Sequence, residues 1–114
     1  MSEARLPAHL EVSGLLRQVN AQGGFATVIA KGEPDGGTIM VLTSCNARDY
    51  KIFERMPQAD GERRWECVRR ADDDRDGTLA AFLDRRRQQD PDLWIVELDI
   101  AQGERFIGLT PSAN

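Results

Sequence analysis

Two acidic residues and a lysine in the first half of the chain are of the types that hold a metal ion and activate water. Asp35 follows Pro34, and Asp49 is separated from Lys51 by one residue, with thirteen residues between the two carboxylates. Two carboxylates at the ends of adjacent strands can bind Mg²⁺, and a lysine beside them can position or activate the attacking water. These residue types are therefore those of metal-assisted hydrolysis.

The same residues, written Pro34-Asp35 and Asp49-Tyr50-Lys51, resemble the motif of the restriction-endonuclease-like nucleases. The resemblance implies that Asp35 and Asp49 are metal ligands and that Lys51 orients the water. In a simple hairpin, however, a strand of about eight residues at roughly 3.3 Å each separates the two carboxylates by on the order of 25 Å. A shared Mg²⁺ needs both within about 2 Å. A metal-dependent nuclease-like domain is therefore the alternative function, and we predict no catalytic residues.

Alternating carboxylates at Asp72, Asp74 and Asp76, followed by Gly77, match the first half of a calcium-binding loop. The second half does not match, because the twelfth position, which must supply a bidentate carboxylate, is Leu83. An acidic first turn that complements a helix dipole explains the same residues. We name these three aspartates as candidate metal ligands and expect no calcium binding tighter than roughly millimolar.

Other reactive residues lack partners in the sequence. His9 is the only histidine and falls at the start of the first expected helix, where solvation explains it. Ser44-Cys45 offers a nucleophile for which the sequence assigns no base. Phosphate-binding loops, dinucleotide fingerprints and nucleophile elbows are not found, so we expect no cofactor.

Composition indicates a globular protein of the cytoplasm. The chain has 114 residues, is 40% hydrophobic and 30% charged, and carries a net charge of -4. Its acidity disfavours nucleic acid as a partner, and no apolar run approaches the roughly 18 residues of a membrane span. The N-terminal segment lacks the apolar stretch of a signal peptide. Cys45 and Cys67 are expected to be reduced and buried.

Hydrophobic spacing predicts two helices and five strands. We expect the first three strands to form a meander of hairpins, and the fourth to lie nearer an edge because one of its faces is wetter. Asp76 or Thr78 is expected to cap the second helix, and Arg85, Arg86 and Arg87 to complement its C-terminal dipole. The predicted elements are a helix from residue 8 to Gly23-Gly24, strands over 25–32, 38–45, 50–56 and 63–70, a helix over 72–89, and a strand from 93.

The last strand is apolar on both faces. Leu93 and Ile95 point to one side, and Trp94, Val96 and Leu98 point to the other. A strand of this kind is usually central and covered on both sides, which the two helices can do as two lids. We therefore expect Trp94 to anchor a helix–sheet layer, with its indole N–H donating to a carbonyl.

Three stretches, "RLPAHLEVSGLLRQ", "GEPDGG" and "RRRQQDPDLWIVELD", resemble a family of small bacterial proteins known as domain of unknown function 1491. Most of the match lies in residues 90–97, Asp-Pro-Asp-Leu-Trp-Ile-Val-Glu. The resemblance covers nearly the whole chain. It implies no activity, cofactor or catalytic residue, and the Asp49-x-Lys51 pair is not a regular feature of the family.

We predict an α/β (α+β) fold with a single mixed, largely antiparallel five-stranded sheet and two helices, in the order α-β-β-β-β-α-β. One domain is expected over residues 1–114, with its core at about 7–108 and frayed ends at 1–6 and 109–114. The expected function is a non-catalytic binding or interaction module, with a protein partner or self-association as the open alternatives. The sequence leaves open whether Arg85, Arg86 and Arg87 bind a partner or simply end a solvated helix.

Overall fold

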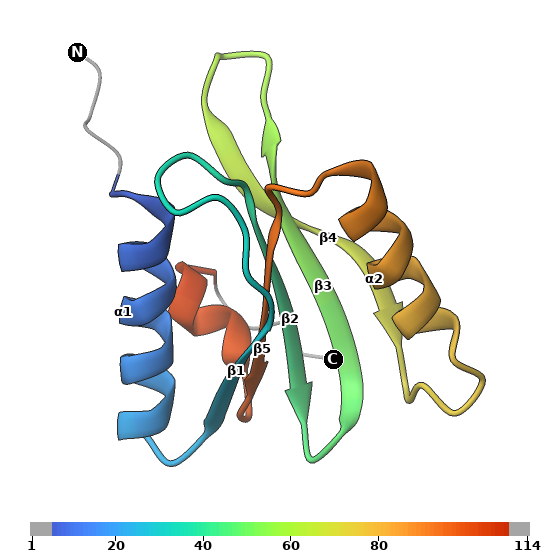
Figure 1. Cartoon of the computed structure of the whole chain (residues 1–114). Helices are drawn as coiled ribbons and strands as arrows, with labels where there is room; N and C mark the ends of the chain where they lie inside the picture. The colour runs from blue at the N-terminus through green and yellow to red at the C-terminus, as the bar shows by residue number, and fades with distance from the viewer. Residues whose placement is uncertain (1–5, 110–114) are drawn as a thin grey trace.

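The computed structural model describes residues 6–109 and shows a five-stranded sheet between two α-helices (Figure 1). Apart from Leu6 and Leu109, the residues predicted to be frayed lie outside the described range. The elements are α1 (Ala8–Ala21), β1 (Phe25–Ala30), β2 (Ile39–Cys45), β3 (Arg48–Pro57), β4 (Arg63–Ala71), α2 (Thr78–Gln89), β5 (Trp94–Asp99) and the 3-10 helix η1 (Gly103–Ile107).

The strand order in the sheet is β1-β5-β2-β3-β4. β5 runs antiparallel to β1 and parallel to β2, and every other pair is antiparallel, so the sheet is mixed. The fold class and the order of the elements are thus confirmed, as is the interior place of β5. β4 is an edge strand, as its wetter face predicted. Val68 is the extra residue of a bulge there, because Ile52 pairs with Arg69 and Phe53 with Cys67.

The predicted meander of the first three strands is wrong. β5 lies between β1 and β2, so only β2, β3 and β4 form consecutive hairpins. The turn residues between β1 and β2 instead wrap around the start of β5, where the Glu33 amide donates to the carbonyl of Asp92 at 3.0 Å. Glycine and proline between two strands indicate that the chain changes direction. They do not indicate whether the two strands pair with each other or are separated by another strand of the sheet.

The helices cover opposite faces of the sheet, which makes three layers (Figure 1). We call these the α1 face and the α2 face. The buried residues of the α1 face are Ala8, Val12, Leu15, Val19, Ile39, Val41, Phe53, Trp94, Val96 and Leu98. Those of the α2 face are Ala30, Met40, Leu42, Ile52, Leu79, Leu83, Leu93 and Ile95. The alternation predicted along β5 therefore divides its side chains between two separate cores.

Trp94 is a core anchor, as the sequence predicted. Only 4% of it is exposed, and its indole Nε1–H donates to the carbonyl of Glu33 at 2.7 Å. The connection that supplies this carbonyl also requires glycine. A Cβ on Gly37 would lie 2.4 Å from the carbonyl oxygen of Asp92, closer than any side chain tolerates. The β1–β2 connection is therefore built to pack against β5.

The second helix begins at Thr78 instead of residue 72, and its N-cap residue is Gly77. The carboxylate of Asp74 accepts hydrogen bonds from the amides of Leu79 and Ala80 at 2.7 and 3.1 Å. It thus satisfies amides that the first turn of a helix leaves without partners. The predicted cap Asp76 contributes as well, since its carboxylate accepts from the Thr78 amide at 3.0 Å, whereas Thr78 is the first residue of the helix and not its cap.

A short 3-10 helix after β5 was not predicted. In η1, Phe106 and Ile107 pack against the α1 face, and the Leu109 amide donates to the carbonyl of Glu104 at 3.1 Å. A helix of five residues is too short for a periodic pattern to be visible in the sequence. No helix among residues 6–109 is long and apolar enough to cross a membrane.

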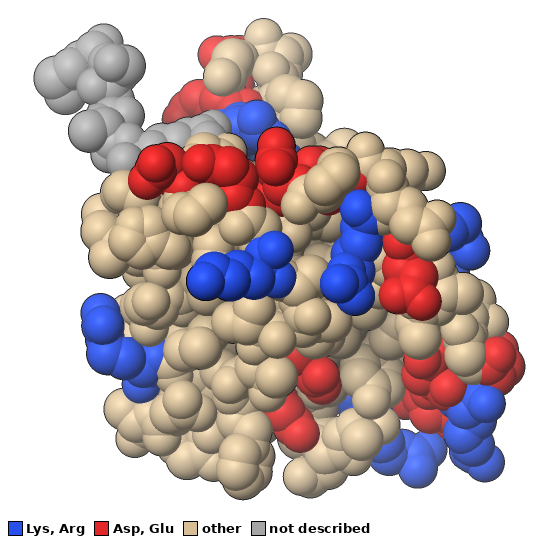
Figure 2. Space-filling view, in the orientation of Figure 1, with Lys and Arg blue, Asp and Glu red and all other residues tan. Residues whose placement is uncertain are grey.

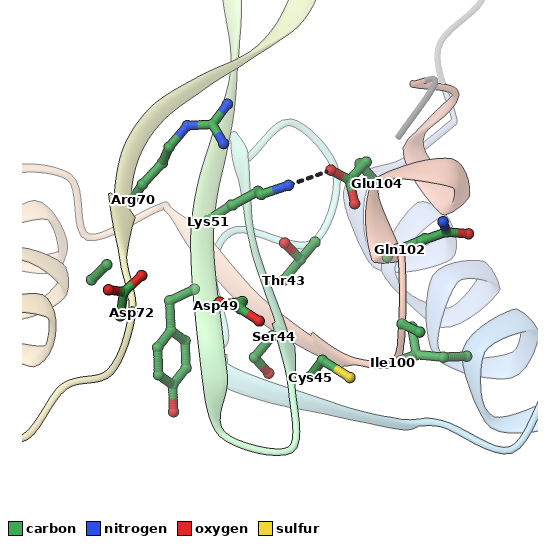
Figure 3. Close-up of a pocket in the computed structure, with 14 residues that line it drawn as sticks. Thr43, Ser44, Cys45, Asp49, Lys51, Arg70, Asp72, Ile100, Gln102 and Glu104 are labelled. Carbon is green, nitrogen blue, oxygen red and sulfur yellow. Dashed lines mark hydrogen bonds and ion pairs between the residues drawn. The ribbon is translucent and has the colours of Figure 1, made fainter. Parts of the chain in front are cut away.

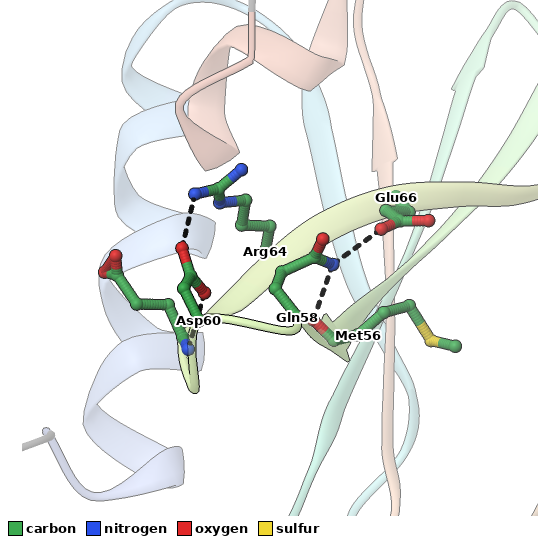
Figure 4. A network of polar contacts seen from close by, with 6 residues as sticks. Met56, Gln58, Asp60, Arg64 and Glu66 are labelled. Carbon is green, nitrogen blue, oxygen red and sulfur yellow. Dashed lines mark hydrogen bonds and ion pairs between the residues drawn. The ribbon is translucent and has the colours of Figure 1, made fainter.

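The tip of the β3–β4 hairpin extends beyond both helices and is held by polar contacts (Figures 1 and 4). Gln58 donates to the carbonyl of Met56 at 3.1 Å and to the carboxylate of Glu66 at 2.7 Å. Arg64 pairs with Asp60 at 3.0 Å. Exposed pairs of this kind contribute little to stability, so the tip depends on the hairpin below it.

Candidate functional site

A pocket of about 460 Å³ opens where the parallel strands β2 and β5 end (Figure 3). Crevices at the carboxyl ends of parallel strands are common ligand sites, and this volume is within the range of small-molecule pockets. We call it the carboxyl-end pocket. Its polar and charged lining residues are Thr43, Ser44, Cys45, Asp49, Tyr50, Lys51, Arg70, Asp72, Gln102 and Glu104.

Unusual backbone conformations cluster at this end of the sheet. Asn46 and Ala47, with φ of 53° and 59°, make the two-residue turn between β2 and β3. Asp49, with φ of 56°, lies in a bulge of β3, and its amide donates to the carbonyl of Asp72 at 2.9 Å. Gln102 has φ of 55°. Left-handed non-glycine residues are uncommon and often accompany functional sites, and within residues 6–109 all four occur here.

Lys51 and Glu104 form an ion pair at one side of the pocket. Lys51 Nζ lies 2.9 Å from Glu104 Oε2, and the two side chains are 19% and 8% exposed. Burial by itself would raise the pKa of Glu104, but the hydrogen bond from Lys51 and the charges of Lys51 and Arg70 hold it below its ordinary value. Glu104 is therefore ionised at neutral pH and connects η1 to β3.

Arg70 lies directly opposite Lys51 in the β3–β4 ladder. Two like charges in this position repel each other, and the Lys51–Glu104 pair leaves the second cation uncompensated. Arg70 is exposed and forms no ion pair within residues 6–109. In Figure 3, Arg70, Lys51 and Glu104 lie at one end of the pocket, and Asp49 lies nearer the β2–β3 turn. The lining holds three carboxylates, Asp49, Asp72 and Glu104, and two cations, so an anion would be accepted only at the end with Arg70.

Ser44 gains a partner that the sequence did not assign. Its hydroxyl donates to the carboxylate of Glu97 on β5 at 2.9 Å. Close by, burial and the neighbouring carboxylates Glu97, Asp74, Asp99 and Asp73 raise the pKa of Tyr50, so its phenol stays protonated at neutral pH. Tyr50 packs against the α2 face, and Ser44 is 3% exposed, so both hydroxyls are directed away from Lys51 and Glu104.

The residues that the sequence grouped as a possible nuclease site do not all come together. Asp49 and Lys51 both line the carboxyl-end pocket. Asp35 belongs to the β1–β2 connection, before the start of β2, whose seven residues span roughly 20 Å. There the carbonyl of Asp35 accepts a hydrogen bond from the Ala8 amide at 3.0 Å, so this residue helps to begin α1.

The aspartates of the calcium-like segment contact backbone groups. Asp74 caps α2 as described above, Asp76 accepts from the Thr78 amide at 3.0 Å, and the carbonyl of Asp72 holds the bulge of β3. The hydrogen bonds that the Asp76 carboxylate accepts from Thr78 lower the pKa of Asp76. Among residues 6–109, no three His, Cys, Asp or Glu side chains are arranged to hold a metal ion.

The arginines at the end of α2 have different surroundings. Arg86 pairs with Glu54 on β3, and both side chains are largely buried. Arg85 and Arg87 are exposed. The middle residue of the run therefore fastens α2 to the sheet, which is a role that its position near the helix terminus did not predict.

Three residues of the pocket were missed in the sequence: Arg70, Gln102 and Glu104. Arg70 stands in a strand with several other arginines, and Glu104 follows β5 in a segment without a periodic pattern. Neither has a neighbour in sequence that marks it. Only the pairing of β3 with β4 and the position of η1 bring Arg70 and Glu104 beside Lys51.

Comparison with known proteins gives a family and several structures. The family model described as "Protein of unknown function (DUF1491)" matches residues 6–108. A crystal structure of a DUF1491 family protein from Caulobacter crescentus CB15 is 32% identical, with a TM-score of 0.76, over 94% of this chain and 97% of that one. An NMR structure of a DUF1491 family protein from the same organism is 30% identical, with a TM-score of 0.76, over 91% and 94%.

The solution structure of protein Atu0922 from A. tumefaciens is also similar, with 32% identity and a TM-score of 0.74 over 97% of this chain and 99% of that one. No curated protein sequence matches the chain. These similarities extend over nearly the whole length of each structure, so the likeness is not confined to one motif.

Proposed function

This chain belongs to the DUF1491 family, and from that premise and the geometry of the pocket we propose that it is a non-catalytic binding module for a small anionic ligand. The family has no stated function, so the proposal depends on the carboxyl-end pocket. Its ligand carries a carboxylate or a phosphate group. Arg70 binds that group.

The observation that carries the proposal is the placement of Lys51 and Arg70 beside Glu104, at the end of the pocket away from Asp49 (Figure 3). Lys51 and Arg70 are cross-strand neighbours, and Glu104 pairs with Lys51 alone. A bound anion would relieve the repulsion that remains between the two cations. The planar guanidinium of an arginine is suited to carboxylate and phosphate, which it can bind through two parallel hydrogen bonds.

The state of the other groups supports binding over catalysis. The ammonium of Lys51 is held by Glu104, so it is not free to activate a water molecule. The hydroxyl of Ser44 is directed to Glu97, and the only histidine of the chain, His9, is exposed on α1. The nuclease alternative requires Asp35 beside Asp49, and β2 separates them. We expect no cleavage of DNA or RNA with Mg²⁺ or Mn²⁺.

The distribution of charge on the surface supports a small ligand over nucleic acid. On the face shown in Figure 2, Lys and Arg form separate patches among Asp and Glu. A phosphate backbone needs several cations along one path. We also propose a cytoplasmic location, which is supported by the free thiols of Cys45 and Cys67.

The proposal is tested by titrating the ¹⁵N-labelled protein with inorganic phosphate and, separately, with acetate. We expect shifts of the amides that line the carboxyl-end pocket, and affinity at least about tenfold lower in Arg70→Gln, because a hydrogen bond to a charged group contributes roughly 1.5–3 kcal/mol. Arg85→Gln is the matched control, since it removes the same charge from an exposed position on α2. Equal affinity in the two variants would refute the proposal.

A further inference from the structure

We propose that the groove between α1 and η1 binds an acidic amphipathic helix of a partner protein. This α1–η1 groove is lined by Leu6, Leu10, Gly14, Trp65, Phe106 and Ile107 and has a volume of about 550 Å³. It is separate from the carboxyl-end pocket, so the inference goes beyond the proposed function.

The groove exposes large apolar side chains. Leu6 is 62% exposed and Leu10 is 48% exposed, and the half-buried rings of Trp65 and Phe106 lie between them and the core. Leu10 and Gly14 are four residues apart, so they lie on the same side of α1. Contiguous apolar surface of this kind, with a polar rim, marks interaction sites in soluble proteins.

Gly14 lies in the interior of α1, where glycine disfavours the helix relative to alanine. A Cβ at this position would meet no atom of the described residues within 4 Å, outside its own helix backbone. The contrast with Gly37 is clear, because a Cβ there would collide with the carbonyl of Asp92. The fold therefore does not require glycine at position 14. A glycine facing open space in a groove instead allows another backbone to approach closely.

The charges at the groove favour an acidic partner. Arg17 lines it and is exposed. Arg55 stacks over Trp65 at 4.7 Å, and Arg105 stacks over Phe106 at 4.4 Å. The one carboxylate in the lining, Glu11, has both oxygens engaged by Arg55. Arg55 and Glu11 therefore neutralise each other, and the exposed cations that remain beside the groove, Arg17 and Arg105, form no ion pair within residues 6–109.

A second copy of the chain is a less suitable occupant. A symmetric dimer through this groove would place the same patch against itself, and its exposed arginines would face one another. An acidic helix would instead pair its carboxylates with Arg17 and Arg105 and its apolar side chains with the leucines and rings. The lining follows α1 from Leu10 to Gln18, roughly 12 Å at the rise of a helix. Leu6 extends it beyond the start of α1, and the whole length fits a helix of about two to three turns.

The test uses two synthetic peptides of about fourteen residues with the same leucines, spaced three and four residues apart. One carries Glu at every other position, and the second carries Lys. Binding of each dye-labelled peptide to the full chain is followed by fluorescence anisotropy. We expect the Glu peptide to bind at least tenfold more tightly than the Lys peptide, and the preference to diminish in Arg17→Glu.

Two leucine variants locate the binding. Gly14→Leu fills the groove and is expected to weaken binding of the Glu peptide tenfold or more. Ser13→Leu adds the same side chain at the adjacent exposed residue, which does not line the groove, and is expected to leave binding unchanged. Thermal unfolding verifies that both fold, and Arg70→Gln should leave peptide binding intact whether or not the carboxyl-end pocket binds anions.

Three outcomes would overturn the inference. Equal binding of the Glu and Lys peptides would remove the argument from charge. Equal affinity of Gly14→Leu and Ser13→Leu would place the peptide elsewhere. A dimer seen by analytical ultracentrifugation that Gly14→Leu alone dissociates would show that a second copy occupies the groove.

Discussion

The two helices cover the sheet by different means. α1 buries four apolar side chains, Ala8, Val12, Leu15 and Val19, against the α1 face. α2 buries only Leu79 and Leu83 against the other face. Since burial of apolar area is the main source of folding free energy, α1 is attached mainly by its apolar stripe.

α2 depends more on charge. Arg86 pairs with Glu54, Arg69 of β4 stacks over Phe82 at 4.4 Å, and Asp74 caps the first turn. Such contacts are weaker than apolar burial and are partly screened by salt. The two faces of one sheet are therefore covered with unequal strength. We expect α2 to open more readily than α1, in the sense of local unfolding.

The largest effect should come from Trp94. Trp94→Ala removes the ring that joins α1 to the sheet and is expected to cost about 3–5 kcal/mol of unfolding free energy. Leu83→Ala, on the α2 face, is expected to cost about 2–3 kcal/mol, at the lower end for buried leucines. Urea denaturation measures both. Equal costs, or a larger one for Leu83, would contradict the unequal strength of the two covers.

The Lys51–Glu104 pair is an exception to the apolar character of the α1 side. Lys51→Met leaves a nearly buried carboxylate without its partner and is expected to cost about 2–3 kcal/mol. The pKa of Glu104 in the folded protein lies below its ordinary value of 4.5. Ionised Glu104 therefore stabilises the fold above that pH, and the contribution is lost as the pH falls through the lowered pKa.

Unfolding free energies measured between pH 7 and pH 3 test this dependence. Glu104→Gln cannot ionise, so its stability should decrease less than that of the unmodified protein as the pH falls below about 4.5. Parallel decreases in the two proteins would show that Glu104 does not contribute, and that other carboxylates control the acid response.

The ion pair between Arg86 of α2 and Glu54 of β3 should contribute about 1 kcal/mol to the unfolding free energy. Glu54→Gln weakens the pair with Arg86 and is expected to lower the unfolding free energy by roughly that amount, within the range for partly exposed pairs. Hydrogen exchange should become faster at α2 amides, while α1 amides keep their protection. Glu62→Gln is the matched control, since Glu62 is exposed and its carboxylate forms no ion pair within residues 6–109. Equal acceleration of exchange in both helices would remove the distinction between them.

The smallest expected effect on the unfolding free energy is an increase instead of a decrease. Gly14→Ala improves the helix propensity of α1 and meets no steric obstacle, so it should raise the unfolding free energy by roughly 0.5–1 kcal/mol. Thermal unfolding measures the change. A loss of stability would mean that the Gly14 backbone has a close contact within the isolated protein. Glycine at this position would then be required by the fold and not by a partner.

Much of the architecture could be predicted from sequence because burial leaves a periodic pattern. Two apolar faces in β5 predicted an interior strand with two covering helices, and the wetter face of β4 predicted an edge. The position of α1 followed from apolar residues at helical spacing and the glycines that follow it. Each of these signals lies within a single element, where local geometry fixes which side chains share a face.

The strand order and the candidate site were decided by the tertiary structure. β5 enters between β1 and β2, and no local residue marks that gap. Lys51 meets Glu104 across 53 positions, and Ser44 meets Glu97 across the same separation. Asp35, which the sequence grouped with Asp49, lies at the other end of β2. A contact between charges depends on the pairing of distant strands, and periodicity reports only which face of an element is buried.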